Sequence, residues 1–263
     1  MENVNNCPTI ATTSYNMSDK YKFQSTKQII SFFESQGFSL ASKKVCRVRK
    51  QSKQGFQKHM LRFDHEALKI DDQNRLQVLV KNSHDGSSSL QINLGIYRLV
   101  CSNGLVIGEE FMGYNLRHTG HQFYIKLEQS LKELIVAAPK YKELIIKMKN
   151  TKINDKDKHN FIIESINMRL IDINNITEIN IDSFQPIRLE DDKNDIYTVF
   201  NMIQERIIKG GVKYITKQTK LDENNNNIIE FKQHTTKKIN SIDKDIELNK
   251  FLFDKAMSYL KIA

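Results

Sequence analysis

The chain has 263 residues, with 40 Lys and Arg against 31 Asp and Glu, and a formal net charge of +9. This length excludes a peptide or a disulfide-stapled miniprotein, and it allows one large domain or two modest ones with a real core. Three cysteines at no metal-ligand spacing indicate free thiols. No segment approaches the roughly 20 apolar residues that span a bilayer, so we expect a cytoplasmic protein without membrane contact.

The N-terminal elements follow a helix-then-strand pattern. Residues 1–22 are polar and aperiodic, so we expect a frayed segment there. Residues 25–37 predict a helix, because Ile29, Phe32 and Phe33 share one face and a glycine ends it. Strand-like runs rich in Val, Ile, Leu and Phe follow, with polar breaks between them. They span residues 43–50, 56–64, 75–82, 88–95 and 105–112.

After Gln122 the hydrophobic period changes from about two residues to about 3.6, which indicates an amphipathic helix. Pro139 predicts the start of a second helix, because proline lacks only an N–H that a first turn leaves unpaired. A polar stretch at 151–160 then separates these helices from the C-terminal region. The apolar stripe of the first helix comprises Leu127, Leu131, Leu134, Ile135 and Ala138.

The C-terminal region reads as mainly helical. A helix is predicted from a cap at Asn194 or Asp195 to a stop at Gly210, and a last helix over 241–262. Residues 222–227 read as a solvated loop.

The predicted fold class is α+β. We expect an N-terminal domain over 23–150, mainly antiparallel sheet with packing helices, followed by a mainly helical region over 151–263.

The most unusual charge distribution lies within residues 36–63, which contain eight basic residues and no acid. Such a segment suits a polyanion, with phosphates on the cations. The alternative is a solvated hairpin whose lysines suppress edge-to-edge aggregation. The eight basic residues are Lys43, Lys44, Arg47, Arg49, Lys50, Lys53, Lys58 and Arg62.

A hairpin turn at QSKQG would place like charges opposite each other in this segment. Arg47 would then lie opposite Lys58, and Lys43 opposite Arg62, with Phe56 on the same face as a stacking surface. Like charges that face each other across a ladder cost stability. We therefore expect a nucleic acid strand between them.

A second candidate stretch covers residues 80–108 and contains two turn signals, DG within KNSHDGSSS and the later NG. Arg98 lies between them in an otherwise apolar element, so it needs either a carboxylate such as Asp85 or an anionic ligand. With Arg117 it forms a second predicted cationic surface. The first turn offers hydrogen-bonding groups to a phosphate or base from Lys81, Asn82, His84, Ser87 and Ser88.

The motif NSHDGSSS followed by G-x-x-R-L-V-C-S-N-G-L resembles the signature of domain-of-unknown-function family 932, encoded by phages, plasmids and cryptic prophages. The resemblance covers roughly residues 25–150, and VFNMIQERIIKGG is similar to a helical segment of the same family. It implies a mobile-element protein that works near DNA in a bacterial or phage-infected cell. It implies no particular activity.

Two enzymatic interpretations are weaker. His84 and Asp85 could join His118 and His121 around a metal, but a metal nuclease usually needs several carboxylates. Cys101 could act as a thiol nucleophile with His84 and Asp85, but it follows an apolar run that is typical of core. We expect neither site, and no cofactor.

The sequence therefore predicts a non-enzymatic protein that binds single-stranded or locally opened DNA through the basic hairpin and the Arg98 and Arg117 surface. DNA is favoured over RNA, and recombination, strand annealing or replication support are the expected uses. One alternative is an interaction protein that counters host defence or assembles with another phage protein through its helical C-terminal half. A second alternative is a metal-dependent nuclease. The sequence is compatible with a homo-oligomer.

Overall fold

A computed structural model describes most of the chain, and its contacts divide the chain into two compact units. One unit comprises Met1–Glu143 with Ser241–Ile246, and the other comprises Leu144–Asn240 with Glu247–Ala263. The predicted frayed segment, residues 1–22, lies outside the described residues. These are 23–47, 50–72, 74–98, 104–106, 113–116, 122–170, 175–221 and 227–262.

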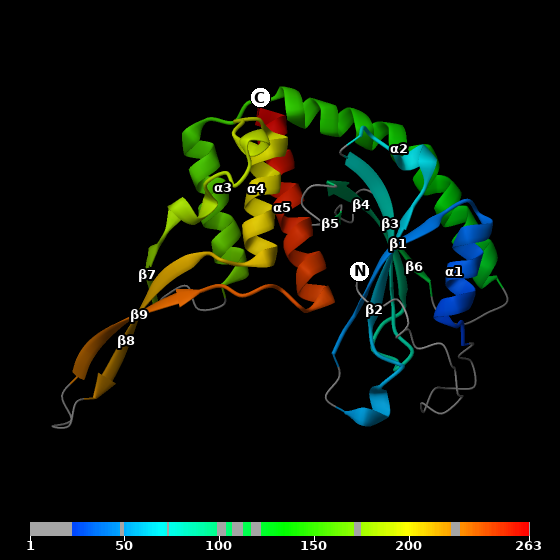
Figure 1. Cartoon of the computed structure of the whole chain (residues 1–263), viewed down its shortest axis with the longest axis horizontal. Helices are drawn as coiled ribbons and strands as arrows, with labels where there is room; N and C mark the ends of the chain where they lie inside the picture. The colour runs from blue at the N-terminus through cyan, green and yellow to red at the C-terminus, as the bar shows by residue number, and fades with distance from the viewer. Residues whose placement is uncertain are drawn as a thin grey trace. The chain divides into compact units, whose positions relative to one another are not determined.

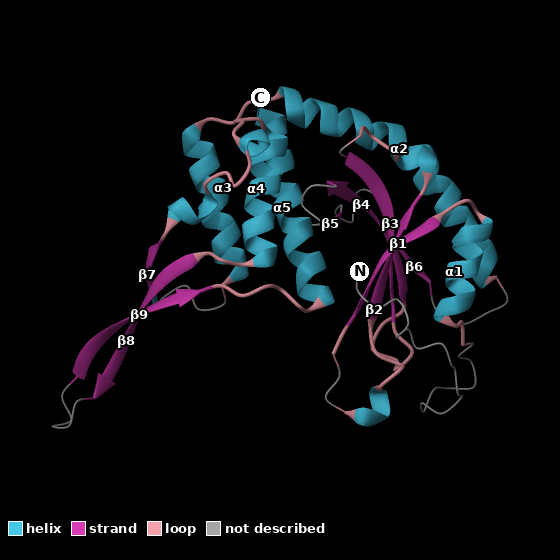
Figure 2. Ribbon diagram, in the orientation of Figure 1, coloured by secondary structure: helices cyan, strands magenta, loops and turns pink. Residues whose placement is uncertain are grey.

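The first unit is built on an antiparallel sheet, as predicted (Figure 2). The strand order is β1-β2-β3-β4-β5, and β6 also pairs with β4. Residues 95–97 of β4 pair with β5, whereas residues 90–93 pair with β6, so the two short strands share one edge. The strands are β1 (Ser39–Val45), β2 (His59–Asp64), β3 (Asn74–Asn82), β4 (Leu90–Arg98), β5 (Gly104–Val106) and β6 (Gly113–Leu116).

Helix α1 (Thr26–Ser35) packs on one face of this sheet, and its prediction is confirmed. Ser25 and Gln28 form a capping box, which satisfies orphan N–H groups of the first turn. Phe33 stacks on Phe63 of β2, with 4.0 Å between ring centroids. Side chains alternate between the two faces of a strand, so Met60 points to the opposite face. There it packs with Leu79 and with Ile242.

Helix α2 (Phe123–Asn150) is continuous, so the prediction of a new helix at Pro139 is wrong. Pro139 removes one hydrogen bond inside the helix, which typically costs about 3 kcal/mol. Apolar residues on both sides of it, including Leu134 and Ile145, are fully buried and offset that loss. The predicted stripe before Pro139 is confirmed: Leu127, Leu131, Leu134 and Ala138 are buried, and Ile135 is half-buried.

The second unit contains α3 (Asp155–Arg169), α4 (Ile196–Lys209) and most of α5 (Ile242–Ile262). The prediction for α4 is confirmed at both ends. Asp195 accepts a hydrogen bond from the Thr198 N–H, and Gly210 ends the helix at φ 89°. A side chain at Gly210 would also collide with the backbone of Thr236. The predicted polar separator ends earlier than expected, because Asn154 caps α3.

This unit also holds a three-stranded antiparallel sheet that sequence analysis does not predict. It consists of β7 (Ile176–Ile179), β8 (Lys213–Leu221) and β9 (Asn227–Thr235), in the order β7-β8-β9. Figure 1 shows β8 and β9 extending from the helices of this unit. Both units contain short 3₁₀ helices. In the first unit these are η1 (Gln51–Lys53) and η2 (Glu66–Leu68), and in the second η5 (Ile181–Phe184) and η6 (Leu189–Asp191). No described helix combines the length and apolar character needed to cross a bilayer.

Candidate nucleic-acid interface

The β1–β2 hairpin has a different register from the predicted one. Lys43 lies opposite Leu61, and Arg62 lies opposite Ser42. The predicted facing of Lys43 and Arg62 is therefore wrong. The reason is a shift of one residue, which moves each side chain to the other face of the strand. Lys43 and Arg62 consequently point to opposite faces of the sheet.

The cations on the Met60 face of this hairpin have acidic partners far along the chain. Lys44 Nζ lies 2.7 Å from a carboxylate oxygen of Asp245, and Lys58 Nζ lies 2.5 Å from Asp243. Lys81 of β3 reaches the same Asp243 at 3.0 Å. Both acids lie in the first turn of α5, where the helix dipole favours negative charge. Residues 36–63 contain no acid, but the fold supplies acidic partners to these cations from α5.

The pKa of Asp243 is lower than the ordinary value of an aspartate. Partial burial of this carboxyl raises its pKa, but hydrogen bonds from Lys58 and Lys81 lower it by more. The carboxylate therefore stays ionised at neutral pH and forms an ion pair with each of the two ammonium groups.

Three further cations of the hairpin are half-buried or paired within the hairpin region. Lys53 Nζ lies 3.0 Å from Asp85, and Arg62 Nε donates a hydrogen bond to Ser42 Oγ. Lys43 Nζ is buried and has no hydrogen-bond partner among the described residues.

The structure excludes Asp85 as the carboxylate partner of Arg98, which was one of the two alternatives. Arg98 lies opposite Asn74 at the N-terminal end of β3, whereas Asp85 comes three residues after Asn82, at the C-terminal end of the strand. Eight residues of strand separate these ends by about 27 Å. Lys53 and Ser87 hold the Asp85 carboxylate instead.

The signature turn directs its histidine into the core. His84 is 2% exposed and His59 is fully buried. The Thr26 Oγ1 atom lies 3.0 Å from His59 Nε2 and 3.3 Å from His84 Nε2. Through Thr26, His59 joins the start of α1 to β2, and His84, which is predicted to face a ligand, joins it to the turn after β3.

The hydrogen bonds among Thr26, His59 and His84 show which ring nitrogens carry a proton. His59 Nδ1 lies 3.1 Å from the Gln57 carbonyl, so it must donate, and a neutral imidazole then leaves Nε2 as acceptor. The Thr26 hydroxyl therefore donates to His59 and accepts from His84 Nε2. Burial lowers the pKa of His59 to about 4, the Gln57 hydrogen bond opposes this, and the Lys43 charge adds to the lowering. His59 is therefore neutral near pH 7, and both of its ring nitrogens have hydrogen-bond partners.

Other predicted site residues have mixed placements. Arg47 and Lys50 are exposed and Phe56 is half-buried, and their contact with a nucleic acid stays a prediction. Asn82 is buried, Ser87 is exposed, and Ser88 donates a hydrogen bond to the Ser89 carbonyl. Arg49, Cys101, Arg117, His118, His121 and the side chain of Arg98 lie outside the description. Within the described part of the chain, no three His, Cys, Asp or Glu residues are grouped to hold a metal.

A second basic surface, missed by sequence analysis, is formed by β8 and β9, which we call the β8–β9 ribbon. Its two strands carry four lysines and one acid, Glu230, which pairs with Lys220. Among the described residues, the other three lysines form no ion pair. All four are exposed: Lys213, Lys217, Lys220 and Lys232.

The ribbon also exposes apolar side chains. Ile228, Ile229 and Phe231 are 46%, 55% and 64% exposed. Lys217 lies directly opposite Phe231 in the register, so this cation and aromatic ring share one face. Nearer the helices, Tyr214 stacks on His234 with 5.1 Å between ring centroids, which ties the two strands together.

A hairpin signal exists in this part of the sequence. KYITKQTK and IIEFKQHT alternate around the polar tract DENNNN, which is typical of two strands and their connection. Only the tract was interpreted, as a loop, and residues 222–226 lie outside the described residues.

Comparison with known proteins finds similarity over most of the chain. The model of the family described as Domain of unknown function (DUF932) matches residues 15–249. UPF0380 protein YafZ and UPF0380 protein YfjQ, both from Escherichia coli strain K12, are each 29% identical over 244 residues, which is 92% of this chain and 84% of the relative. No solved structure matches.

Proposed function

We propose that this chain, which belongs to the DUF932 family, is a nucleic-acid-binding protein that contacts a strand through its β8–β9 ribbon. The observation that carries the proposal is the concentration of exposed lysines on two strands that extend from the helices of the second unit and hold a single acid. Two further acids, Asp222 and Glu223, belong to the sequence that connects the strands. Phosphate neutralisation by Lys and Arg dominates the affinity of such proteins. Arg47 and Lys50 are proposed as further phosphate contacts.

Single-stranded or locally opened DNA is the proposed ligand. Phe231 is largely exposed on the face that it shares with Lys217, and an exposed aromatic ring offers a stacking surface to an unpaired base. Recombination, strand annealing or replication support in a bacterial cell are the proposed uses. We propose no catalytic step.

The test is oligonucleotide binding as a function of salt. Replacing Lys213, Lys217 and Lys232 by Gln removes three positive charges from the ribbon. If each contacts one phosphate, the slope of log affinity against log salt becomes shallower by about 2, and affinity near 0.1 M salt falls on the order of a hundredfold. Fluorescence anisotropy with single-stranded, double-stranded and RNA oligonucleotides measures both quantities.

A matched control removes the same charge elsewhere. Lys126, Lys147 and Lys156 are exposed and, within the described part of the chain, form no ion pair. Replacing all three by Gln should leave the salt slope nearly unchanged. Equal losses in the two triple variants, or no binding by the unmodified chain, would overturn the proposal.

A second candidate function is docking of a protein partner, favoured by the exposed Ile228, Ile229 and Phe231. In that case replacing Ile229 and Phe231 by Ser abolishes co-purification of a partner. The purified protein would also show an absorbance ratio at 260 and 280 nm that high salt does not change, because no nucleic acid is retained.

A further inference from the structure

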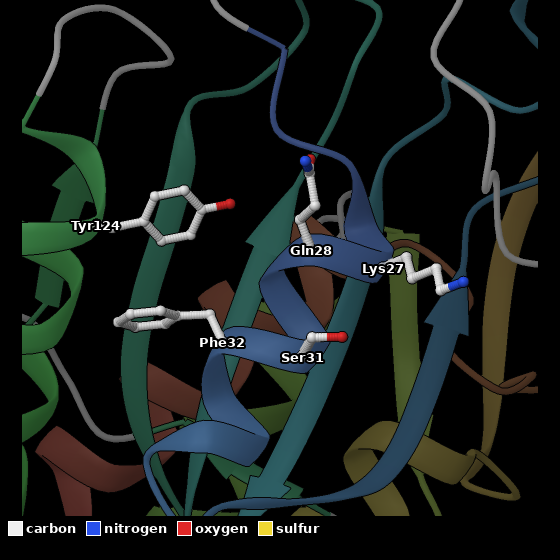
Figure 3. Close-up of a pocket in the computed structure, with 5 residues that line it drawn as sticks. All are labelled: Lys27, Gln28, Ser31, Phe32 and Tyr124. Atoms are coloured by element: carbon white, nitrogen blue, oxygen red, sulfur yellow. The ribbon is translucent and has the colours of Figure 1, made fainter.

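A hollow in the first unit combines aromatic rings with a cation. It lies between α1 and the start of α2, has a volume of about 380 Å³, and is lined by Lys27, Gln28, Ser31, Phe32 and Tyr124 (Figure 3). Ligand pockets usually measure about 300 to 1,000 Å³, so this hollow suits one small planar group.

Two aromatic rings form one side of the hollow. The ring centroids of Phe32 and Tyr124 lie 5.1 Å apart, with the planes tilted by 46°. Both residues are half-buried, so part of each ring remains accessible. Partial burial raises the pKa of Tyr124, which keeps its hydroxyl protonated at neutral pH and able to donate a hydrogen bond.

Polar donors form the other side. Residues four apart on a helix are neighbours, so Lys27 and Ser31 form one ridge of α1, and Gln28 and Phe32 form the next, nearer Tyr124 (Figure 3). The Gln28 carbonyl oxygen accepts hydrogen bonds from Ser25, which leaves its amide N–H groups as donors. The Lys27 ammonium makes no ion pair with a described residue.

The five lining residues include a cation and several donors but no acid. This set matches a ligand that presents a planar ring, ring-edge acceptors and a negative charge. A nucleotide has these three features, because its base stacks on aromatic rings and its phosphate pairs with lysine.

We propose that this hollow binds one nucleotide of a single-stranded nucleic acid, with the base against Phe32 and Tyr124 and the phosphate at Lys27. The inference rests on the proposed function and adds a base-contacting site to the phosphate contacts of the β8–β9 ribbon. The same chemistry could be supplied by a free mononucleotide.

The test separates base contacts from phosphate contacts. Replacing Phe32 and Tyr124 by Leu keeps apolar volume but removes both rings. We expect the affinity for oligothymidylate to fall at least about fivefold, because stacking on aromatic rings is energetically significant. Affinity for an abasic oligonucleotide of the same length should be unchanged. Lys27→Gln should instead make the salt slope shallower by about 0.7.

The control removes exposed apolar side chains from α2 outside the hollow. Ile125 and Val136 are 65% and 80% exposed, and replacing both by Ala should not change either affinity. Circular dichroism confirms that each variant is folded. Saturation-transfer NMR with thymidine monophosphate distinguishes the two ligand sources: a signal lost in the Phe32→Leu, Tyr124→Leu variant shows that a free nucleotide occupies the hollow.

The outcomes distinguish this inference from the proposed function. The ribbon variant has Lys213, Lys217 and Lys232 replaced by Gln, and the hollow variant has Phe32 and Tyr124 replaced by Leu. If the ribbon variant binds oligothymidylate weakly while the hollow variant binds it normally, the inference fails and the proposed function stands. If the unmodified chain binds no oligonucleotide, the proposed function fails. If in that case thymidine monophosphate also gives no signal, the inference fails as well. An equal loss on abasic and intact strands would likewise overturn the inference.

Discussion

The β1–β2 hairpin and the β8–β9 ribbon are both rich in lysine, but their counter-charges lie in different places. Lys44 and Lys58 of the hairpin reach Asp245 and Asp243, which are far away in sequence but adjacent in the fold. On the ribbon, Glu230 is the one acid of the two strands and pairs with Lys220. Local net charge is therefore a poor guide to which basic segment is available to a polyanion.

This comparison indicates a structural role for the paired lysines of the hairpin and supports the proposed binding role of the ribbon. Substitutions near the hairpin should then change stability more than binding, and substitutions on the ribbon should do the reverse.

The largest expected effect on stability is at Thr26. Thr26→Val keeps the shape but removes the hydroxyl that lies between His59 and His84, so two buried ring nitrogens lose this hydrogen bond. The free energy of unfolding should fall by about 3 kcal/mol. Urea denaturation measures this. Thr26→Ser retains the hydroxyl and should lose clearly less, and equal losses would refute the assigned hydrogen bonds.

The next effect is the pH dependence that His59 contributes. Its pKa is about 4 in the folded chain against 6.5 ordinarily, so the unfolded chain takes up a proton first as the pH falls. The free energy of unfolding should decrease below pH 6.5, at about 1.4 kcal/mol per pH unit, or about 2 kcal/mol by pH 5. Denaturation of His59→Gln should show a flatter profile between these pH values. Parallel profiles would contradict a neutral, buried His59.

A smaller effect is expected at Asp243. Asp243→Asn removes the carboxylate that pairs with Lys58 and Lys81, and because this side chain is 53% exposed the loss should be about 1 kcal/mol. The two freed lysines should also raise oligonucleotide affinity a few-fold. The matched control is Asp72→Asn, which removes an acid that is 98% exposed. If both variants raise affinity equally, net charge alone explains the change.

The smallest effect on stability is expected on the ribbon itself. Replacing Lys213, Lys217 and Lys232 by Gln touches no ion pair among the described residues, so thermal and urea midpoints should stay within about 0.5 kcal/mol of the unmodified chain. A larger loss would mean that these lysines support the fold.

Local patterns predicted much of the fold. The cap of α4 at Asp195 and its stop at Gly210 both follow from residues at the ends of one helix. The continuous helix through Pro139 could not be predicted, because burial on both sides of the proline outweighs its local preference.

Less of the candidate site could be predicted from the sequence. The partners of Lys44 and Lys58 belong to helix α5, and no local pattern connects residues so far apart in sequence. The β8–β9 ribbon can be predicted from the sequence, because residues with strand-like alternation flank the polar tract DENNNN on both sides.

The most direct test compares the salt slopes of two variants that lose equal charge. One replaces Lys213, Lys217 and Lys232 of the ribbon by Gln, and the other replaces Lys44, Lys53 and Lys58 of the hairpin by Gln. For single-stranded DNA, we predict a slope shallower by about 2 in the ribbon variant and nearly unchanged in the folded hairpin variant. A shallower slope in the hairpin variant alone would contradict the central claim.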